Sequence, residues 1–585
     1  MDSRLTRVAM LLPVIGAPAG LLFAILASLM ISGWRVQHSA IVQVDTQWRP
    51  GEQLALRVHV QNGEGVGVPD AVVQATLRRG EQAAALAEAR DVTGGGSTQA
   101  TLEVPAWDAG PAELQLDIVA GERRFRETVP LTIDRARAVR HGTVTISTSV
   151  KNWSDDTEPQ PERLRIALRP LGRIAAGFDN TLLVRVTDSE GVPHVGPIEV
   201  RVIDGEFGDK RAVSGAGPQV VAAGTTDAQG LLRFDGPLST DVVRFEVRVL
   251  APPIVAAPPP EGCSKCEDAA RAALKQGRRK PGTVAPETAA PEAVAPGTVI
   301  EQPPLGSRKF RLVSFAGAVR VSAEPLALRS GATLQIHARA LRAKKPVFVD
   351  VHGPDGAWVD TFAPVTGPEP PRAWSTAGLS PGFVQIEAYQ FTTSPGESAA
   401  LARVQITEGE PDTDAALAPL FEQQRALMSV GRVEKGFDRE LERKYLDTIE
   451  KAVIPSTEVP LARAWLLGTL PIEVLGPPLA LATLAREQAD LAARKLSWAA
   501  GLRWFLLGGG GVFLLTTLLL IVISHRRAAA KLTGEIHGAA ATAEIAREIA
   551  QAQRAVLVRA IALVVTMALG LVLMVVVLDK LLWSA

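Results

Sequence analysis

Long apolar runs stand near both ends of the chain. They cover residues 8–34, 504–524 and 556–578, and each reaches the roughly 20 residues that cross a bilayer as a helix. Between the first and second runs the sequence holds no comparable stretch. The pattern therefore predicts three transmembrane helices and one large block outside the membrane.

The outer block is dominated by alternation of apolar and polar residues. Leu54, Leu56 and Val58 illustrate the period of two, and turn signals such as Asn62-Gly63 separate successive runs. Short strands at this spacing are typical of antiparallel sandwiches. The fold class is thus a mainly β ectodomain of tandem immunoglobulin-like antiparallel sandwiches. The predicted sandwiches cover residues 40–134, 142–317 and 318–408.

Residues 251–306 interrupt the second sandwich. They are rich in Pro, Ala, Glu and Thr, a composition that buries too little apolar surface to order itself. Because strand-like sequence lies on both sides, we interpret the segment as a long insertion within a hairpin.

The period changes after the third sandwich. Leu441, Tyr445 and Ile449 recur at helical spacing, and residues 413–503 are predicted to form a helical stalk. Residues 461–476 are apolar but interrupted by charge and proline, which favours an interfacial or partner-facing segment over a membrane span. The stalk is expected to continue directly into the second transmembrane helix.

Basic residues at the ends of the apolar runs predict the orientation. Arg4 and Arg7 precede the first run, Arg526 and Arg527 follow the second, and Arg559 lies at the start of the third. Such residues favour the cytoplasmic side. Residues 1–7 and the helical loop 525–555 are therefore predicted to be cytoplasmic, with the sandwiches on the opposite side.

Composition narrows the compartment. The chain has 62 basic and 62 acidic residues, so no overall field favours nucleic acid as a partner. Only two cysteines are present, unlike many eukaryotic ectodomains. With the abundance of Arg, Ala and Gly, this favours a bacterial inner-membrane protein, multi-pass, with a large periplasmic domain.

The first sandwich carries a recognisable order of motifs. Trp48-Arg49-Pro50-Gly51-Glu52 precedes a strand, a Gly-x-Pro turn follows at residues 67–69, and a later strand ends at residues 104–105. This order resembles the macroglobulin-type sandwiches of alpha-2-macroglobulin and its bacterial relatives. The resemblance implies a sandwich fold and a tendency to bind proteins. It does not imply the family's thioester chemistry, because the Cys-Gly-Glu-Gln motif is not in this sequence.

Cys263 and Cys266 form the one cysteine motif, and they lie within the insertion. A local disulfide in an oxidising compartment is the favoured interpretation. A redox-active or partner-linked thiol pair is the alternative. A zinc site needs four ligands, and the sequence places no second pair nearby.

Asp350 and His352 are the other candidate pair, two residues apart on a predicted strand. They could coordinate a cation, but a polar sheet edge is the preferred interpretation. Together with the lack of nucleophile or nucleotide motifs, this predicts a protein that is not an enzyme and has no catalytic residues, metal site, cofactor or small-molecule substrate.

A stripe of small residues marks the first apolar run. Gly16, Gly20, Ala24 and Ser28 recur every fourth position, a spacing that lets helices approach closely in lipid. We interpret the stripe as a membrane helix-packing face, with chance in a chain rich in Ala and Gly as the alternative.

Three functions fit these features. The first is a non-enzymatic envelope protein whose periplasmic sandwiches bind or scaffold other proteins. The second is a protease-binding regulator that uses the proline-rich insertion as bait. The third is an accessory subunit of a membrane transport, motility or signalling complex. All three expect protein partners in the envelope or membrane.

Overall fold

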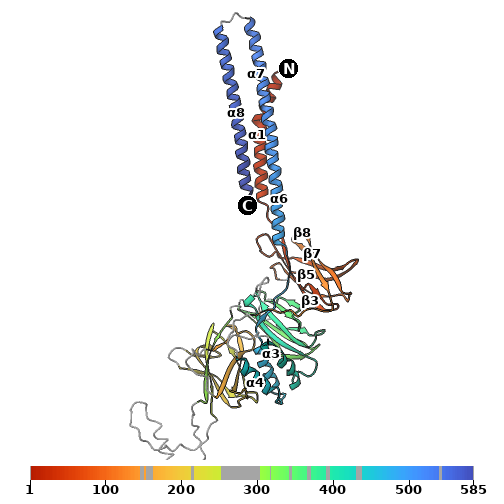
Figure 1. Ribbon diagram of the computed structural model, residues 1–585, viewed down its shortest axis with the longest axis vertical. Coiled ribbons are helices and arrows are strands. Elements are labelled where there is room, and N and C mark those ends of the chain that lie inside the picture. The colour runs from red at the N-terminus through yellow and green to blue at the C-terminus, as the bar shows by residue number, and fades with distance from the viewer. Residues whose placement is uncertain are drawn as a thin grey trace, which may run out of the picture. The chain divides into compact units, whose positions relative to one another are not determined.

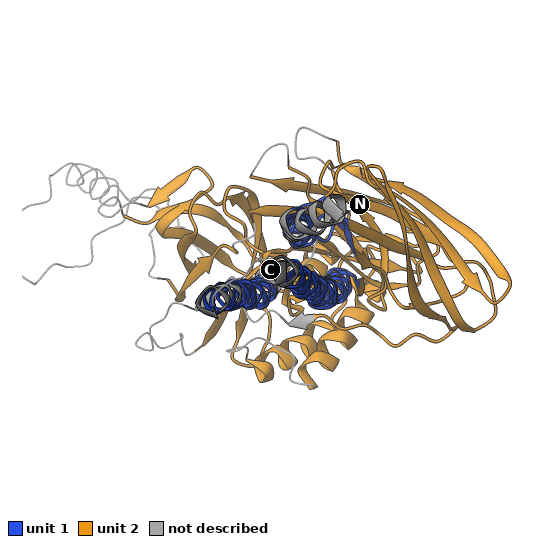
Figure 2. Cartoon of the chain, turned by 90° about the horizontal axis from the view of Figure 1, so that it is seen from above, with its two compact units in different colours: residues 1–40, 60–67, 482–585 blue, residues 41–59, 68–481 orange. Residues whose placement is uncertain are grey.

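The computed structural model describes the chain in segments. These are residues 2–91, 93–144, 150–152, 163–212, 217–251, 304–315, 318–341, 345–364, 370–390, 396–429, 438–538 and 543–583. The chain divides into two compact units (Figure 2): unit 1 holds residues 1–40, 60–67 and 482–585, and unit 2 holds residues 41–59 and 68–481. After an N-terminal helix, the first part of the chain is mainly β-strand and the last part is helical (Figure 1).

The first sandwich consists of two sheets. One has the order β2-β8-β7-β4-β5 and the other β28-β1-β3-β6. Trp48 is fully buried, and Gly51 adopts a φ of +76° in the turn that leads into β3. The strands are β1 (Ser39–Gln43), β2 (Gln47–Trp48), β3 (Gln53–Gln61), β4 (Val72–Arg79), β5 (Gln82–Arg90), β6 (Ser97–Glu103), β7 (Gly110–Ala120), β8 (Arg123–Ile133) and β28 (Leu479–Ala482).

The second sandwich pairs a sheet β10-β18-β17-β13-β14, with β15 also on β13, with a sheet β11-β12-β16. Strands β17 and β18, which flank residues 252–303, pair antiparallel from Val249↔Gly306 to Val242↔Val313, so they form a hairpin around that segment. The strands are β10 (Val150–Asn152), β11 (Leu164–Pro170), β12 (Asp179–Asp188), β13 (Pro197–Phe207), β14 (Lys210–Ala212), β15 (Gln219–Thr225), β16 (Leu231–Pro237), β17 (Val242–Val249) and β18 (Gly306–Val313).

The third sandwich pairs a sheet β19-β21-β24 with a sheet β20-β26-β25-β22-β23. Alternate residues such as Val349 and Val351 of β22 enter its core. The strands are β19 (Val319–Glu324), β20 (Ala327–Arg329), β21 (Thr333–Ala340), β22 (Phe348–His352), β23 (Trp358–Phe362), β24 (Arg372–Ser375), β25 (Gly382–Tyr389) and β26 (Ala400–Thr407). A 3₁₀ turn, η1 (Gly396–Ser398), precedes β26, and β9 (Thr143–Val144) pairs with β27 (Glu473–Val474).

Residues 413–503 divide into two parts instead of forming one stalk. The first part is a cluster of short helices in unit 2, η2 (Asp414–Leu417), α3 (Ala418–Ser429), α4 (Arg439–Ile449) and α5 (Val459–Thr469). The second part is α6 (Leu484–Trp504), which continues through the π-helical turn η3 (Phe505–Gly509) into α7 (Gly510–Gly538). Strands β27 and β28 lie between the two parts, so the predicted continuous stalk is limited to α6.

The apolar residues 461–476 face the chain itself. Trp465, Leu466 and Leu467 of α5 are buried in one core with Leu183 and Leu231 of the second sandwich. Arg185 of β12 supports this packing, because its guanidinium is 2.7 Å from Glu442 and lies over the rings of Tyr445 and Trp465. Most apolar side chains of this segment are therefore buried within the chain instead of lying at a membrane interface.

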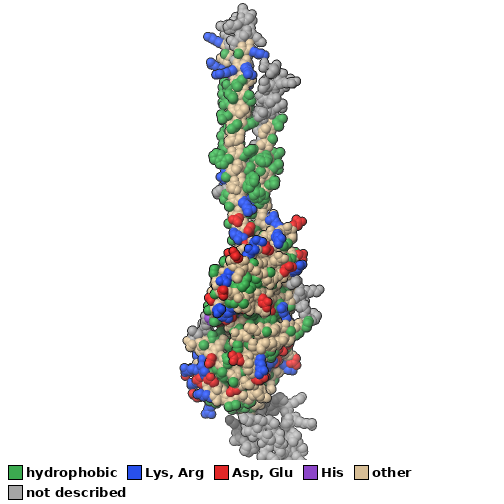
Figure 3. All heavy atoms as spheres, turned by 90° about the vertical axis from the view of Figure 1, so that its right-hand side faces the viewer, with side chains coloured by type: hydrophobic (Ala, Val, Ile, Leu, Met, Phe, Trp, Pro, Cys, Tyr) green, Lys and Arg blue, Asp and Glu red, His purple; other side chains and the backbone are tan. Residues whose placement is uncertain are grey.

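Unit 1 is helical and contains α1 (Asp2–Ser32), α6, η3, α7 and α8 (Ala543–Trp583). In Figure 3, hydrophobic side chains cover much of these helices, and Lys and Arg side chains gather toward the end where α7 approaches α8. Arg526, Arg527 and Lys531 are exposed there. Hydrophobic surface of this kind suits a lipid environment.

Two helical segments, not three, are long and apolar enough to cross a membrane within the described chain. They are Leu484–Arg527 and Ala550–Val577. The predicted first span at residues 8–34 is helical to Ser32, and the apolar helix found among its described residues is Pro18–Ser32, which is shorter than the roughly 20 residues that a bilayer requires. The three-span prediction is corrected to two candidate spans.

Candidate functional site

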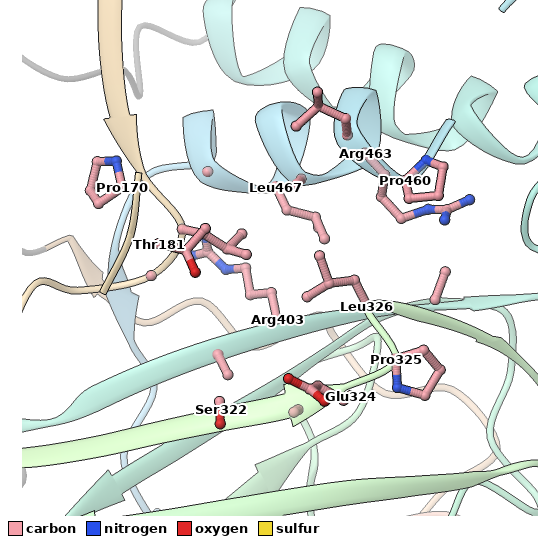
Figure 4. Close-up of a pocket in the computed structure, with 18 of the residues that line it drawn as sticks. Pro170, Thr181, Ser322, Glu324, Pro325, Leu326, Arg403, Pro460, Arg463 and Leu467 are labelled. Atoms are coloured by element: carbon pink, nitrogen blue, oxygen red, sulfur yellow. The ribbon is translucent and has the colours of Figure 1, made fainter. Parts of the chain in front are cut away.

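A cavity lies in unit 2 where the second sandwich, the third sandwich and α5 meet. Its volume is about 980 Å³. Figure 4 shows Arg463 and Leu467 on the α5 side, Ser322 and Glu324 on the strand opposite, and Pro170 at one flank. We call it the arginine cleft. Its volume lies at the upper end of the range typical of ligand sites.

Cationic side chains dominate the charged lining. Five arginines and two carboxylates border the cleft: Arg169, Arg233, Arg320, Arg403 and Arg463 against Glu324 and Asp412. Leucines and prolines form much of the remaining wall, including Leu326, Leu461 and Leu467. A few charges on an apolar wall fix orientation and provide specificity in known sites.

Arg403 lies at the centre of the cleft and is held by neutral acceptors. Its guanidinium donates to the main-chain carbonyls of Leu470, at 3.1 Å, and Pro471, and to the Gln385 amide oxygen at 3.2 Å. Burial lowers the pKa of Arg403 to about 10, although the carboxylates of Glu473 and Glu387 act in the opposite direction. Burial therefore affects the pKa of Arg403 more than these two acids do.

Arg320 and Arg463 also donate to carbonyl and amide oxygens, and Arg463 forms an additional ion pair with Asp412 at 3.5 Å. Arg320 donates to the carbonyl of Arg173 at 2.9 Å, and Arg463 donates to the Gln405 amide oxygen at 3.0 Å and to the Pro411 carbonyl. Burial lowers the pKa of both groups despite nearby carboxylates. The cleft is therefore an electropositive site in which carboxylates of a ligand or partner would be stabilised.

Asp350 and His352 lie in a different place, where the first and third sandwiches pack together. Both side chains are fully buried, because β22 is an interior strand between β23 and β25. The interpretation as a polar sheet edge is wrong. Alternation along β22 sends its apolar residues into the sandwich core and these polar ones toward the first sandwich.

Arg57 of β3 completes that contact. It donates to Asp350 and Thr361, each at 2.6 Å, and to the Tyr389 hydroxyl at 2.6 Å. Burial alone would lower the pKa of Arg57, but Asp350 and Tyr389 outweigh it and the pKa is raised. The guanidinium also lies over the rings of Phe348 and Trp358, at 4.9 and 5.2 Å. This set, the Arg57 network, is a neutralised structural contact.

A second buried acid holds the chain near the same contact. Glu387 accepts from the backbone N–H of Leu475 at 2.6 Å and of Gly476 at 2.9 Å, while Arg140 donates to the carbonyls of the same two residues. Burial raises the pKa of Glu387 to about 7. Burial lowers the pKa of His352 to about 3, which keeps this imidazole neutral at pH 7. Side chains of the third sandwich thus secure the segment after α5.

The helix-packing residues predicted from the sequence differ in their surroundings. Ala24 and Ser28 are buried in unit 1, with Ala24 in one cluster with Leu506. A Cβ on Gly16 would lie 3.8 Å from Phe513, whereas a Cβ on Gly20 would meet no atom within 4 Å. The structure thus brings Gly16 and Ala24 close to other helices, whereas Gly20 has open space beside it.

The predicted cysteine pair and the proline-rich insertion have no counterpart among the described residues. Cys263, Cys266 and nearly all of the insertion 251–306 lie outside the described residues. Among the residues that are described, no group of three or more His, Cys, Asp or Glu side chains could hold a metal ion.

Sequence reasoning missed the arginine cleft and the Arg57 network. One available signal was Arg57 itself, since a charge within Leu54-Ala55-Leu56-Arg57-Val58 is costly to bury unless it is paired. The cleft had no comparable signal, because its arginines come from strands and a helix that are far apart in sequence.

Known proteins show little similarity to this chain. No protein-family model and no curated protein matches the chain. Among solved structures, dimeric latent PorU from Porphyromonas gingivalis is similar over 64% of this chain, with 11% sequence identity and a TM-score of 0.20. The similarity spans 34% of PorU, about a third of its length.

Proposed function

We propose that this chain is a non-enzymatic, membrane-anchored envelope protein whose sandwiches bind other proteins through the arginine cleft. The proposal includes macroglobulin-type sandwiches, for which the support is the Trp48-Arg49-Pro50-Gly51-Glu52 motif that leads into β3. It also includes a bacterial inner membrane, with unit 2 in the periplasm.

The observation that carries the proposal is the charge of the cleft. Arg320, Arg403 and Arg463 each keep a pKa below the usual arginine value, because burial outweighs the nearby acids. A carboxylate entering the cleft would offset this burial cost. An acidic, partly apolar segment of a partner protein matches both the arginines and the leucine wall.

Membrane anchoring is supported by the helices of unit 1. Segments Leu484–Arg527 and Ala550–Val577 have the length and composition of spans. These two segments form the proposed multi-pass anchor. Helix α1 packs against them, since Ala24 clusters with Leu506, Leu571 and Met574.

Topology reporters test the anchor. A reporter fused after Thr413 should lie in the periplasm, and one near Gly538 should lie in the cytoplasm, because exposed basic residues flank the loop between α7 and α8. Placement of both reporters on the same side would contradict the proposed topology.

Photocrosslinking tests the cleft. A photoreactive amino acid in place of Glu324, an exposed residue of the lining, should capture a protein partner in native membranes. Charge reversal by Arg169→Glu with Arg233→Glu should reduce that capture at least tenfold. The matched control is Arg123→Glu with Arg124→Glu, since both residues are exposed on β8 of the first sandwich. Equal capture by the cleft variant and the control would refute the proposed binding site.

A further inference from the structure

Unit 1 contains a second cavity, at the point where α1 ends and α6 begins. Its volume is about 520 Å³. One wall is a single face of α6, with Leu491, Lys495 and Ala499 at helical spacing, and Trp34 and Arg35 close the other side. The lining contains two charged residues, Arg35 and Lys495, and both are cations.

Aromatic residues mark the level of this cavity along the helices. The rings of Trp34 and Trp498 meet edge to face with centroids 6.3 Å apart, and Trp498 is 56% exposed. Exposed tryptophans next to an apolar helical surface are typical of the bilayer interface. Lys495 lies three residues, about 4.5 Å of helix rise, from Trp498.

The two cations are available to an anion at this level. Arg35 is exposed. The ammonium of Lys495 donates to the carbonyl of Ser32 at 3.4 Å, which leaves further N–H donors among its three. Leu491 and Leu496 supply apolar wall beside them, so the cavity combines a polar and an apolar side.

We propose that this cavity binds the headgroup of an anionic phospholipid of the surrounding bilayer. The phosphate lies between Arg35 and Lys495, and the acyl chains follow the apolar surface of α6 and α1. The inference rests on the membrane location in the proposed function, but it does not depend on the arginine cleft.

Lipid competition with the full chain tests the inference. The protein is reconstituted in bilayers that contain equal amounts of phosphatidylglycerol and phosphatidylcholine with matched acyl chains, and retained lipid is counted by native mass spectrometry. Phosphatidylglycerol should be retained preferentially. Arg35→Gln with Lys495→Gln should lower that preference by roughly five-fold per charge, or about 30-fold together.

Arg494→Gln is the matched control, because Arg494 is exposed on the same helix and is not part of the cavity lining. An equal effect of the control, or equal retention of both lipids by the unaltered protein, would overturn the inference. Displacement of the lipid by dilute soluble glycerol phosphate would also overturn it, since the site would then take a free phosphate.

A separate readout distinguishes this inference from the proposed function. Resistance of the protein to alkaline extraction from membranes reports the anchor itself. Retention in the membrane without preference for phosphatidylglycerol refutes the lipid site alone. Extraction of the unaltered protein refutes the membrane location on which both proposals rest.

Discussion

Arg57 and Arg403 are both held inside unit 2, and both belong to strands of β-sandwiches, but their charges are compensated differently. Arg57 meets the Asp350 carboxylate at 2.6 Å, and its pKa is raised. Arg403 meets two carbonyls and an amide, and its pKa is lowered to about 10. The direction of each pKa shift reports which effect is larger, the neighbouring charge or the burial.

The difference separates a structural contact from a candidate binding site. The Arg57 network does not favour binding of a further anion, because Asp350 of the neighbouring sandwich already pairs with the Arg57 guanidinium. In the arginine cleft, Arg320 and Arg403 donate to neutral oxygens, so a ligand carboxylate would add charge-assisted contacts there.

The sharpest way to break this comparison is to remove the Arg57 guanidinium. Arg57→Met should destabilise unit 2 by about 3–5 kcal/mol, because it leaves the Asp350 carboxylate buried without its cation. Urea unfolding followed by tryptophan fluorescence measures the loss, and Trp358 beside Arg57 is a suitable reporter. Combining Arg57→Met with Asp350→Asn should recover part of the stability, since no charge then remains unpaired. A loss below about 1 kcal/mol in the single variant would refute the structural role.

A pH series tests Glu387, a buried acid that interacts electrostatically with Arg403. Glu387 is held by backbone N–H groups, and burial raises its pKa from 4.5 to about 7. The folded protein therefore binds this proton more tightly than the unfolded chain. Its stability contribution is fully present below pH 4.5 and is lost as the pH rises toward about 7.

The expected result is a pH-dependent difference between two proteins. As the pH falls from about 7 to 4.5, the unaltered chain should gain at most about 3 kcal/mol relative to Glu387→Gln. Subtracting the variant removes the opposite contribution of His352, which titrates in both. A difference that stays constant over this range would mean that Glu387 is ionised in the folded protein.

Arg403→Met is the direct partner of the Arg57 experiment. It should cost about 1–3 kcal/mol, less than Arg57→Met, because it leaves carbonyls without donors while the nearby Glu387 carboxyl keeps its backbone N–H partners. The same variant should weaken photocrosslinking from position 324. If Arg403→Met is as destabilising as Arg57→Met, the distinction between the two regions fails.

The sequence predicts the sandwiches better than their contacts. Alternation along β17 and β22 identifies the strands, because one face of each enters a sandwich core. The same alternation cannot tell whether the other face meets water or another sandwich, so it predicts an edge position for Asp350 and His352, which are in fact buried. Similarly, the apolar residues of α5 predict burial without indicating that the covering surface belongs to the same chain.

The helices of unit 1 show the same limitation of sequence-based prediction. The sequence spacing predicts the same helix-packing role for all four small residues of α1, but their surroundings in the structure differ. Ala24 is fully buried and packs near Leu506, whereas an added Cβ at Gly20 meets nothing within 4 Å. A repeat of four residues drifts around a helix of 3.6 residues per turn, so a straight stripe cannot face one neighbour throughout.

The smallest expected effect comes from this pair of positions. Ala24→Leu should weaken the association of α1 with α7 and α8 by about 1–2 kcal/mol, because the added bulk has no space in a buried contact. Gly20→Leu, its matched control, should have little effect. Cysteine crosslinking between α1 and α7 in native membranes measures both, with Gly16 and Phe513 as one pair of positions. If Gly20→Leu separates the helices as strongly as Ala24→Leu, the whole stripe is the packing face and the two halves of α1 do not differ.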